Sequence, residues 1–518
     1  MEGAASNGPT TATAGPLVVS CRHVRSAMLI GVVVACTLVG PAAWSGHLIG
    51  SPLAETYGHA WVRWWTTMAW PAWSQGTALA LGAASWPVID PLPTWFFGGV
   101  ARVVGDTAAW NLCAAAGIVV TAVGGASLAR ALGGSALFGA GAAPLMPIYL
   151  GSIQSGLTED HFLGVVGLAL SAGIERRWIA AGAWSGLAAW CGLYLGWFSG
   201  VGLVVIATHA FAARVFDPSR PGGNSFPSAL RRAARPLAGL ALAASLSAGA
   251  AWPFVSRLGG PTPVRPALVE EPLYALNPWR AADLASFVSP GRPATGNAVI
   301  REHPTYVGAT TLTLATLGGW HPAGFAVMAL GVASLGDEIA FRGHATGFDN
   351  PLATILHAIP LGARFRNHAR LMLLGQLVLV ALASRGVSRV ARASSDNARR
   401  WPIIAGVAAA VAMAFETAVI SPAAFPLSTT STHPPPIYAK VPAGGRPVRV
   451  LGERNPQKAL FDQRFHGHPL NHDPNRPGGG TPRPLSEVIV AFPPNAADLS
   501  ATLGEPDATA QGASAWWP

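Results

Sequence analysis

The sequence alternates long apolar segments with short polar connections, and arginine is concentrated in every second connection. Segments such as 27–44 and 108–129 approach or exceed the length of about 20 helical residues that crosses a bilayer core. The basic connections contain Arg22 and Arg25, Arg130, Arg176 and Arg177, the stretch 214–235 and the stretch 385–400. Cytoplasmic loops are enriched in Lys and Arg, so this alternation predicts a polytopic membrane protein with a cytoplasmic N-terminus.

The composition favours a membrane protein over a soluble one. Of the 518 residues, 51% are hydrophobic and only 11% are charged, which leaves too little polar surface to cover a soluble chain. The net charge of +10 is spread over loops that flank apolar segments, so we expect no nucleic-acid partner. Cys36, Cys113 and Cys191 lie inside apolar segments, which argues against a disulfide framework.

We expect an all-α membrane domain of about 11 transmembrane helices over residues 27–421. The expected spans are 27–44, 108–129, 134–150, 161–175, 178–195, 197–213, 237–254, 306–320, 322–335, 369–385 and 402–421. The apolar pieces Leu92–Val104 and Pro351–Leu361 are too short to span comfortably and are interpreted as interfacial or re-entrant.

Counting the predicted spans from a cytoplasmic N-terminus assigns each remaining part of the chain to the cytoplasmic or the outer side of the membrane. The outer connections are 45–107, 151–160, 255–305 and 336–368. Residues 1–26 are expected to be a disordered cytoplasmic N-terminus, and 214–235 a cytoplasmic linker. Residues 422–518 form a small extracytoplasmic segment rich in Pro and Gly, with strand-like pieces at Val448–Leu451 and Glu487–Phe492.

The first outer loop contains a helical pattern that runs from Glu55 to Trp65. At about 100° per residue, Trp61 and its neighbouring tryptophans share one side of that helix, which we expect in the lipid headgroup region. Glu55, His59 and Arg63 fall on the opposite, water-facing stripe. A carboxylate beside an arginine stays ionised and can act as a base or a metal ligand. An ordinary amphipathic helix with solvated charges is the simpler alternative.

The second outer loop places two acids, Glu159 and Asp160, next to each other. They become candidates for chemistry if they face the same cavity as Glu55. The alternative is structural: Thr158 would be a helix N-cap, and acids in a first helical turn are stabilised by the helix dipole.

The third outer stretch ends with arginines that break the trend of basic residues inside. Arg364, Arg366 and Arg370 crowd around His368 just before a span. Guanidinium groups bind phosphate oxygens in pairs, so we interpret the cluster as a phosphate site at the membrane surface. Snorkelling of the arginines to bulk lipid phosphate is the alternative. In the tail, His466–Asp473 has residue types that bind metals but a spacing that fits no established site.

The arrangement resembles the GT-C type of membrane glycosyltransferase, and in particular large bacterial multi-pass proteins related to that superfamily. The segments that carry the resemblance are Glu55 to Trp65, Asp90-Pro-Leu-Pro, Tyr149 to Asp160, Tyr306-Val-Gly, Arg364 to Arg370, Pro436-Ile-Tyr438 and Phe465-His-Gly-His-Pro-Leu. One departure is that Glu55 stands alone where many GT-C enzymes carry Asp or an acidic pair.

The resemblance implies sugar transfer from a polyprenyl-phosphate-linked donor to a glycan, lipid or protein acceptor, at the extracytoplasmic face of a bacterial inner membrane. It implies Glu55 as the catalytic base and Glu159 or Asp160 as a second acid or metal ligand. The substrate and phosphate binders would be His59, Arg63, Arg364, Arg366 and Arg370. A divalent metal cofactor and the oligomeric state are left open.

Two other classes of function remain as alternatives to an enzyme. A lipid or polysaccharide transporter would place ionisable residues near the midplane of the membrane. Almost all ionisable residues here lie in loops, with Glu416 as the clearest intramembrane exception, and this pattern favours chemistry at the surface. A non-catalytic membrane assembly protein would instead use the outer tail as its binding module.

Overall fold

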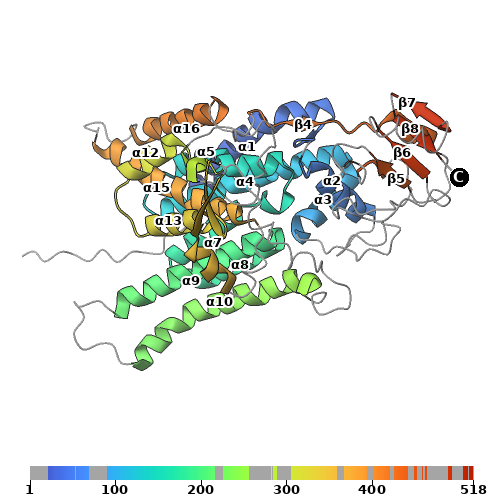
Figure 1. The fold of residues 1–518 in the computed structure, drawn as a ribbon. Helices are drawn as coiled ribbons and strands as arrows, with labels where there is room; N and C mark the ends of the chain where they lie inside the picture. Colours follow the sequence, from blue (N-terminus) through green and yellow to red (C-terminus); the bar gives the residue numbers. More distant parts are fainter. Residues whose placement is uncertain are drawn as a thin grey trace, which may run out of the picture.

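The structure is a computed structural model in which most of the described residues form α-helices, with a small sheet at one end (Figure 1). It describes residues 21–52, 54–68, 90–215, 226–255, 282, 284–288, 305–342, 344–358, 367–393, 401–419, 425–441, 448–451, 458, 461–463, 488–492, 506–511 and 513–516. Of the expected disordered N-terminus over 1–26, residues 1–20 lie outside these ranges, and the expectation is wrong for residues 21–26, which belong to the helix Cys21–Ser45.

Four helical stretches among the described residues are long and apolar enough to cross a bilayer. They are His23–Ala43 in α1 (Cys21–Ser45), Asp106–Ala131 (α4), Leu193–Ala212 in α9 (Leu193–Val215), and His368–Ala393, which joins the 3₁₀ helix η6 (His368–Arg370) to α15 (Leu371–Ala393). A fifth span is possible if a pair bent by 43° counts as one: α5 (Ala136–Ala142) with η1 (Ala143–Leu145), followed by α6 (Pro147–Gln154).

The expected count of about 11 spans is not confirmed, because several apolar segments form short helices. These are α7 (Gly164–Ile174), α8 (Trp178–Cys191), α12 (Ala309–Leu317) and α13 (Ala323–Ala333), with α16 (Trp401–Val419) somewhat longer. At 1.5 Å per residue the four shortest extend only ~14–21 Å, which is less than a bilayer core of ~30 Å. The predicted linker 214–235 is also partly wrong, since α10 (Phe226–Val255) is helical from Phe226 onward.

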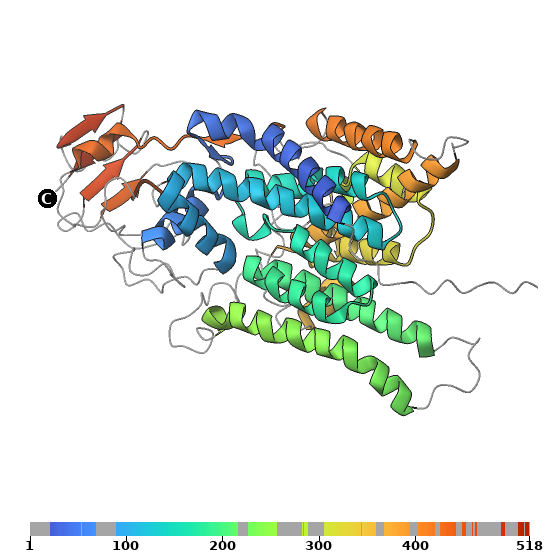
Figure 2. The same cartoon turned by 180° about the vertical axis from the view of Figure 1, so that it is seen from behind.

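Small residues let these helices pack closely around α4. A Cβ added at Gly124 would lie 2.0 Å from the carbonyl oxygen of Gly164, so the contact between α4 and α7 requires glycine. The pair α9 and α10 forms one edge of the helical body (Figure 2). In contrast, α15 is almost wholly enclosed, and it contacts α4, α5, α12, α13 and α16. The start of α15 is therefore held firmly by its surroundings.

The sheet and two further helices cover one end of the helical body (Figures 1 and 2). The helices are α2 (Thr56–Met68) and α3 (Pro91–Val104). The sheet has the order β5 (Val448–Leu451), β6 (Val488–Ala491), β8 (Ala513–Trp516) and β7 (Ala508–Ala510), with β5 parallel to β6 and the other pairs antiparallel. Both strand-like pieces predicted in the tail are thus present.

The tail also covers the tryptophan side of α2, which corrects the prediction that this side faces lipid headgroups. Trp61 is only 1% exposed and packs among Ile437, Tyr438 and Val490 of the tail. Its indole N–H donates to Gln463 Oε1 at 2.9 Å. Helical periodicity separates the two sides of α2 correctly, but the apolar side is buried by protein.

A short antiparallel ladder ties the first outer loop to the beginning of the tail. β1 (Leu48–Ile49) pairs with β4 (Thr429–Thr430). Both strands must lie on the same side of a membrane, so the chain has to cross an even number of times between them. The predicted succession of spans meets this condition.

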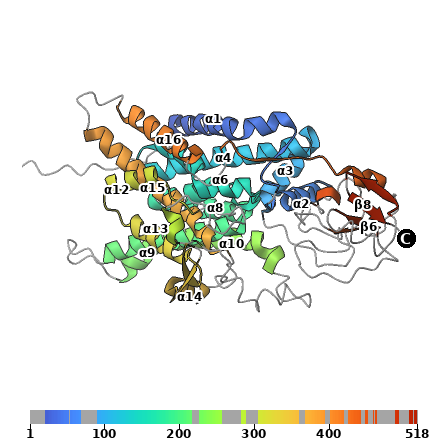
Figure 3. The same cartoon turned by 45° about the horizontal axis from the view of Figure 1, so that its top comes forward.

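The remaining described elements lie in the predicted outer connections. A hairpin of β2 (Glu338–Phe341) and β3 (His344–Asp349) leads into α14 (Pro351–Ala358), which lies at the edge of the body beside α13 (Figure 3). Three 3₁₀ turns complete the list: η2 (Thr158–Asp160), η4 (Leu284–Phe287) and η7 (Pro436–Lys440).

Candidate active site

Charged side chains from two predicted outer connections and from the start of a predicted span meet at the end of the helical body that carries α2. Glu55 immediately precedes α2, and His59 lies in its first turn. Glu159 belongs to η2, and Arg370 ends η6 at the mouth of α15. The structure therefore brings together four of the side chains that the sequence singled out.

Glu55 and His59 form the outer part of this cluster. His59 Nε2 lies 3.2 Å from Glu55 Oε2, as expected for residues four apart on a helix. The Glu55 side chain keeps 39% of its surface exposed, whereas that of His59 keeps 17%. Glu55 thus presents a carboxylate at the border between a buried charge cluster and solvent.

Glu159 joins this pair to Arg370. Its Oε1 accepts from Arg370 Nη1 at 2.9 Å, and its Oε2 lies 3.8 Å from His59 Nδ1. The Arg370 guanidinium also stacks on the Tyr194 ring at 4.6 Å from the centroid, and its Nε lies 4.0 Å from Asp160 Oδ2. One buried acid is therefore held between two cationic groups.

Asp90 is the residue of the site that sequence reasoning did not assign. It lies just before α3, whose first turn is favoured by Pro91 and Pro93. Its carboxylate accepts from Arg63 Nη2 at 2.8 Å and from the Thr94 hydroxyl at 2.9 Å. Its acidic type and its place in the Asp-Pro-Leu-Pro motif were visible in the sequence, but its partners were not.

Thr158 links Asp90 to the rest of the cluster. Its hydroxyl donates to Asp90 Oδ2 at 2.6 Å and lies 3.3 Å from His59 Nδ1. The predicted N-cap role of Thr158 is wrong, since Leu157 occupies the position before η2. Because the hydroxyl proton is directed to Asp90, His59 Nδ1 must be the donor to Thr158, and a second proton on Nε2 serves Glu55. The contacts therefore fit a doubly protonated imidazole.

The electrostatics agree with that protonation state. Burial would lower the pKa of His59, but the carboxylates of Glu159, Glu55 and Asp90 raise it to about 9. Burial would raise the pKa of Glu159, yet Arg370 and His59 lower it below its usual value. Burial also acts to raise the pKa of Glu55, but the hydrogen bond with His59 and the charge of that imidazolium outweigh this effect. The pKa of Glu55 therefore lies below its usual value. Both glutamates are ionised at neutral pH.

Asp160 behaves differently from its neighbour. Its side chain is fully buried, and burial raises its pKa to about 6 in spite of the opposing charge of Arg370. It is less suited than Glu159 to carry a permanent negative charge. Of the two adjacent acids, Glu159 is held ionised by its ion pair with Arg370, whereas Asp160 has a pKa of about 6.

Arg63 does not lie on a water-facing stripe with Glu55, which corrects that expectation. Its side chain is 1% exposed and points to Asp90, and its Nη1 also donates to the Pro93 carbonyl oxygen at 3.1 Å. The rings of Phe97 and Trp110 flank the guanidinium. Arg63 therefore neutralises Asp90 and fixes α3 against α2.

Gly156 makes the close approach of the second loop possible. Its φ is +76°, and a Cβ at this position would lie 2.5 Å from the Cα of Thr56. Both the left-handed backbone and the contact with the first turn of α2 exclude a larger residue. The glycine thereby sets the distance between the loop that carries Glu159 and the helix that carries His59.

The acids around Arg370 do not fit a divalent metal site. Arg370 and His59 already approach the two carboxylate oxygens of Glu159. Among the described residues, the one group of three or more His, Cys, Asp or Glu with ligand atoms within 4.8 Å of one another lies elsewhere. No step involving a metal is therefore assigned to this cluster.

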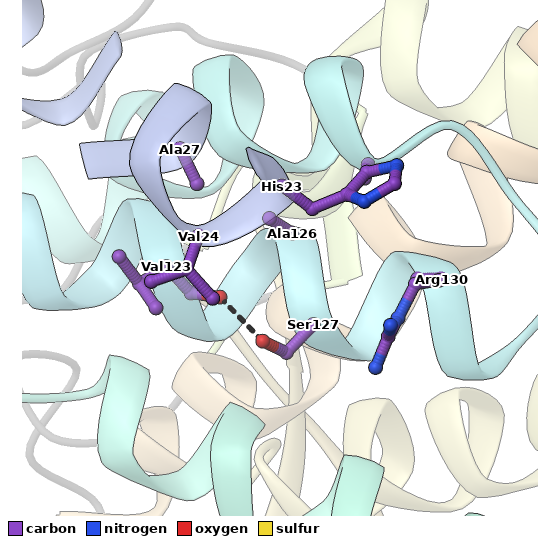
Figure 4. A pocket seen from close by; sticks show the side chains of 8 residues that line it. His23, Val24, Ala27, Val123, Ala126, Ser127 and Arg130 are labelled. Atoms are coloured by element: carbon purple, nitrogen blue, oxygen red, sulfur yellow. Dashed lines mark hydrogen bonds between the residues drawn. The ribbon is translucent and has the colours of Figure 1, made fainter. Parts of the chain in front are cut away.

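Some predicted residues cannot be placed. Arg364 and Arg366 lie outside the described residues, as does His466–Asp473 of the tail. A separate pocket occurs between the start of α1 and the end of α4, where it is lined by His23, Ser127 and Arg130 among small apolar side chains (Figure 4). The pocket adjoins the N-terminal end of α1, whereas Glu55 follows the C-terminal end of that helix. It is therefore separate from the cluster of Glu55, His59, Glu159 and Arg370, which is called the acidic cluster below.

Comparison with solved structures finds matches at 12–13% sequence identity. The apo oligosaccharyltransferase of Archaeoglobus fulgidus matches with a TM-score of 0.45 and 12% identity, over 88% of this chain and 65% of that one. The Archaeoglobus fulgidus enzyme AglB in complex with an inhibitory peptide and a dolichol-phosphate matches with a TM-score of 0.46 and 12% identity, over 90% and 69%. ArnT from Cupriavidus metallidurans, bound to undecaprenyl phosphate, matches with a TM-score of 0.49 and 13% identity, over 96% and 97%.

This chain thus spans 65% of the length of the apo Archaeoglobus protein and nearly all of ArnT. No protein-family profile and no curated protein sequence matches the chain.

Proposed function

We propose that this protein is a glycosyltransferase of the bacterial inner membrane. It would move a sugar from a polyprenyl-phosphate-linked donor to a glycan, lipid or protein acceptor at the extracytoplasmic face. The observation that carries the proposal is the position of Glu55, an ionised and partly exposed carboxylate held by the His59 imidazolium. A carboxylate so placed can receive a proton from an acceptor hydroxyl that arrives from solvent.

The reaction needs one base and one stabilised leaving group. The acceptor oxygen attacks the anomeric carbon, its proton passes to Glu55, and the bond between that carbon and the donor phosphate oxygen breaks. The electron pair of the broken bond stays on the phosphate. His59 orients the Glu55 carboxylate throughout, because Glu159 and Thr158 hold the other side of the ring.

Arg370 pairs with Glu159 in the structure, and this contact keeps that acid ionised and holds its loop in place. We propose that Arg364 and Arg366, a few residues before it, provide guanidinium groups for the donor phosphate at the interface. Arg63 is a positioning residue in this proposal, since its guanidinium is buried against Asp90.

The transporter alternative loses its main support from the sequence. Glu416, the clearest intramembrane acid, lies in α16 and is only 6% exposed. Its carboxylate accepts from the backbone N–H groups of Ala309 and Thr310, the latter at 2.9 Å, in the first turn of α12. A carboxylate bound to a helix N-terminus stabilises that helix, which explains Glu416 without a transport pathway.

The test is an assay of donor consumption in nanodiscs. Purified protein is supplied with undecaprenyl-phosphate-linked monosaccharides and an extract of envelope lipids and glycans, and released undecaprenyl phosphate is measured by mass spectrometry. We expect release that depends on the acceptor extract. Glu55→Gln keeps the size of the side chain and removes the base, so release should fall by roughly a hundredfold or more.

The matched control is Asp349→Asn, which removes an exposed acid of β3. It should release the lipid at the wild-type rate. Wild-type release by Glu55→Gln would contradict the assignment of the base, and no consumption of any donor by the wild-type protein would contradict the proposed function.

A further inference from the structure

Three side chains with metal-binding atoms meet outside the acidic cluster. Asp337 lies just before β2, His357 in the last turn of α14, and His368 at the first position of η6. One ligand atom from each residue can be chosen so that all three lie within 4.8 Å of one another. Three separate segments therefore each contribute one ligand atom to the same small region.

We propose that Asp337, His357 and His368 bind a transition-metal ion, with Zn²⁺ as the best-suited occupant. Zn²⁺ binds imidazole nitrogen and carboxylate oxygen at about 2.0–2.2 Å in tetrahedral geometry, which places two ligand atoms roughly 3.3 Å apart. His357 Nε2 lies 3.3 Å from Asp337 Oδ1. Ca²⁺ and Mg²⁺ prefer sites made wholly of oxygen, so two imidazoles select against them.

The surroundings of the three ligands suit an ion that enters from solvent. The side chains of Asp337 and His357 are 38% and 39% exposed, whereas His368 is 6% exposed. The ring centroids of His357 and His368 lie 5.7 Å apart at a tilt, so the two imidazoles are not stacked face to face. Three protein ligands with one open side leave the fourth position to water.

The backbone around Asp337 is fixed by neighbours that are not ligands. Asn350 donates from its backbone N–H to the carbonyl oxygen of Asp337 at 2.8 Å. Its side-chain amide donates to the carbonyl oxygens of Val332 and Gly336. One ligand is thus held in place by the protein itself, which lowers the entropy cost of assembling the site.

A bound ion would have a consequence for the neighbouring site. His368 is two residues before Arg370, and both belong to η6. The ion would tie η6 to α14 and to the segment before β2, and so fix the start of the segment from which Arg370 reaches Glu159. The proposal does not depend on sugar transfer, because metal binding is measured on the purified protein.

The test measures metal content and coordination. The full chain, purified in detergent with an affinity tag free of histidine, is stripped with a chelator, incubated with Zn²⁺ and analysed by mass spectrometry for bound metal. We expect about one tightly bound ion per chain, and at least a tenfold loss of affinity in His357→Ala and in His368→Ala. Co²⁺ in place of Zn²⁺ should give the visible absorption of a tetrahedral ion.

His433→Ala is the control, since His433 is an exposed histidine of the tail, and it should bind like the wild type. His357→Ala carries the test if the buried His368 proves necessary for folding, because His357 is partly exposed. Less than one ion per wild-type chain at saturating Zn²⁺, or unchanged affinity in His357→Ala, would overturn the proposal.

Discussion

Arg370 at the mouth of α15 donates to Glu159 Oε1 at 2.9 Å, and both side chains are almost fully buried. The contact joins a segment between α6 and α7 to α15, the most enclosed of the four described helical stretches that are long enough to cross a bilayer. Glu159 in turn approaches His59, which orients Glu55. The position of the exposed carboxylate is therefore set by an ion pair that lies behind it.

Removal of Arg370 should destabilise the protein strongly. Arg370→Ala takes from the buried Glu159 the nearer of its two cationic partners, and the loss of one partner of a buried ion pair costs about 3–5 kcal/mol. Arg392→Ala removes an exposed arginine in the last turn of the same α15 and should change stability by less than about 0.5 kcal/mol. Denaturant unfolding in mixed micelles gives both values. Equal stability of the two variants would mean that the ion pair contributes nothing.

Arg364 and Arg366 should determine the binding of lipid-linked phosphate. Lysine keeps the charge but lacks the planar fork, so Arg364→Lys and Arg366→Lys should weaken the binding of undecaprenyl phosphate if guanidinium pairs hold it. Snorkelling to bulk lipid would tolerate both changes. Binding is measured in nanodiscs with labelled lipid. Wild-type affinity in both variants would reduce these arginines to membrane anchors.

Gly156→Ala should damage the site through a steric contact. The added Cβ would lie 2.5 Å from Thr56 Cα and would push Glu159 away from His59. Gly133→Ala is a matched control, because Gly133 has a φ of +77° but open space around its Cα. Both changes carry the backbone strain of about 1–3 kcal/mol. Only Gly156→Ala should also reduce transfer, and a similar loss in both variants would assign the effect to backbone strain.

The stability of the site should decrease as pH rises from neutrality. The pKa of His59 is raised from 6.5 to about 9, so the imidazolium contributes fully below pH 6.5 and its contribution is lost as pH passes 9. The unfolding temperature of the wild type should exceed that of His59→Gln most at pH 6. The gap should narrow toward pH 9.5. A gap independent of pH would show that His59 is neutral in the folded protein.

The orientation of the chain can be read by chemical labelling. We predict that β1, β4 and the tail lie outside, whereas the basic connection around Ser219 lies inside. Ser428→Cys should react in intact cells with a thiol reagent that does not cross membranes, and Ser219→Cys should react only after lysis. The reverse result would place the acidic cluster in the cytoplasm.

The parts of the site that the sequence could predict depend on local geometry. Glu55 and His59 are four residues apart on a helix, so their contact follows from periodicity. Periodicity also separates Trp61 from Glu55, but it does not tell what covers each side. The tail covers Trp61, and Asp90 receives Arg63, because segments distant in sequence pack there.

The same limit applies to the membrane helices. Hydropathy locates the apolar segments, yet the lengths of helices such as α7 and α12 depend on turns and on neighbouring helices. The pairing of Glu159 with Arg370 is a tertiary contact as well. Each residue was a candidate in its own right, and only the fold shows that they act on each other.

Because the tail packs over α2, that helix cannot be fully packed until the tail has been synthesised. Ribosomes make Trp61 early and Gln463 late, so the indole has no partner from the tail while the intervening chain is being synthesised and inserted. β1 likewise has no strand partner until β4 has been synthesised. The helix that carries His59 can reach its final position only after the last membrane segment is in place. The proposed transfer would therefore have to wait until the residues around Gln463 have been made and have docked on α2.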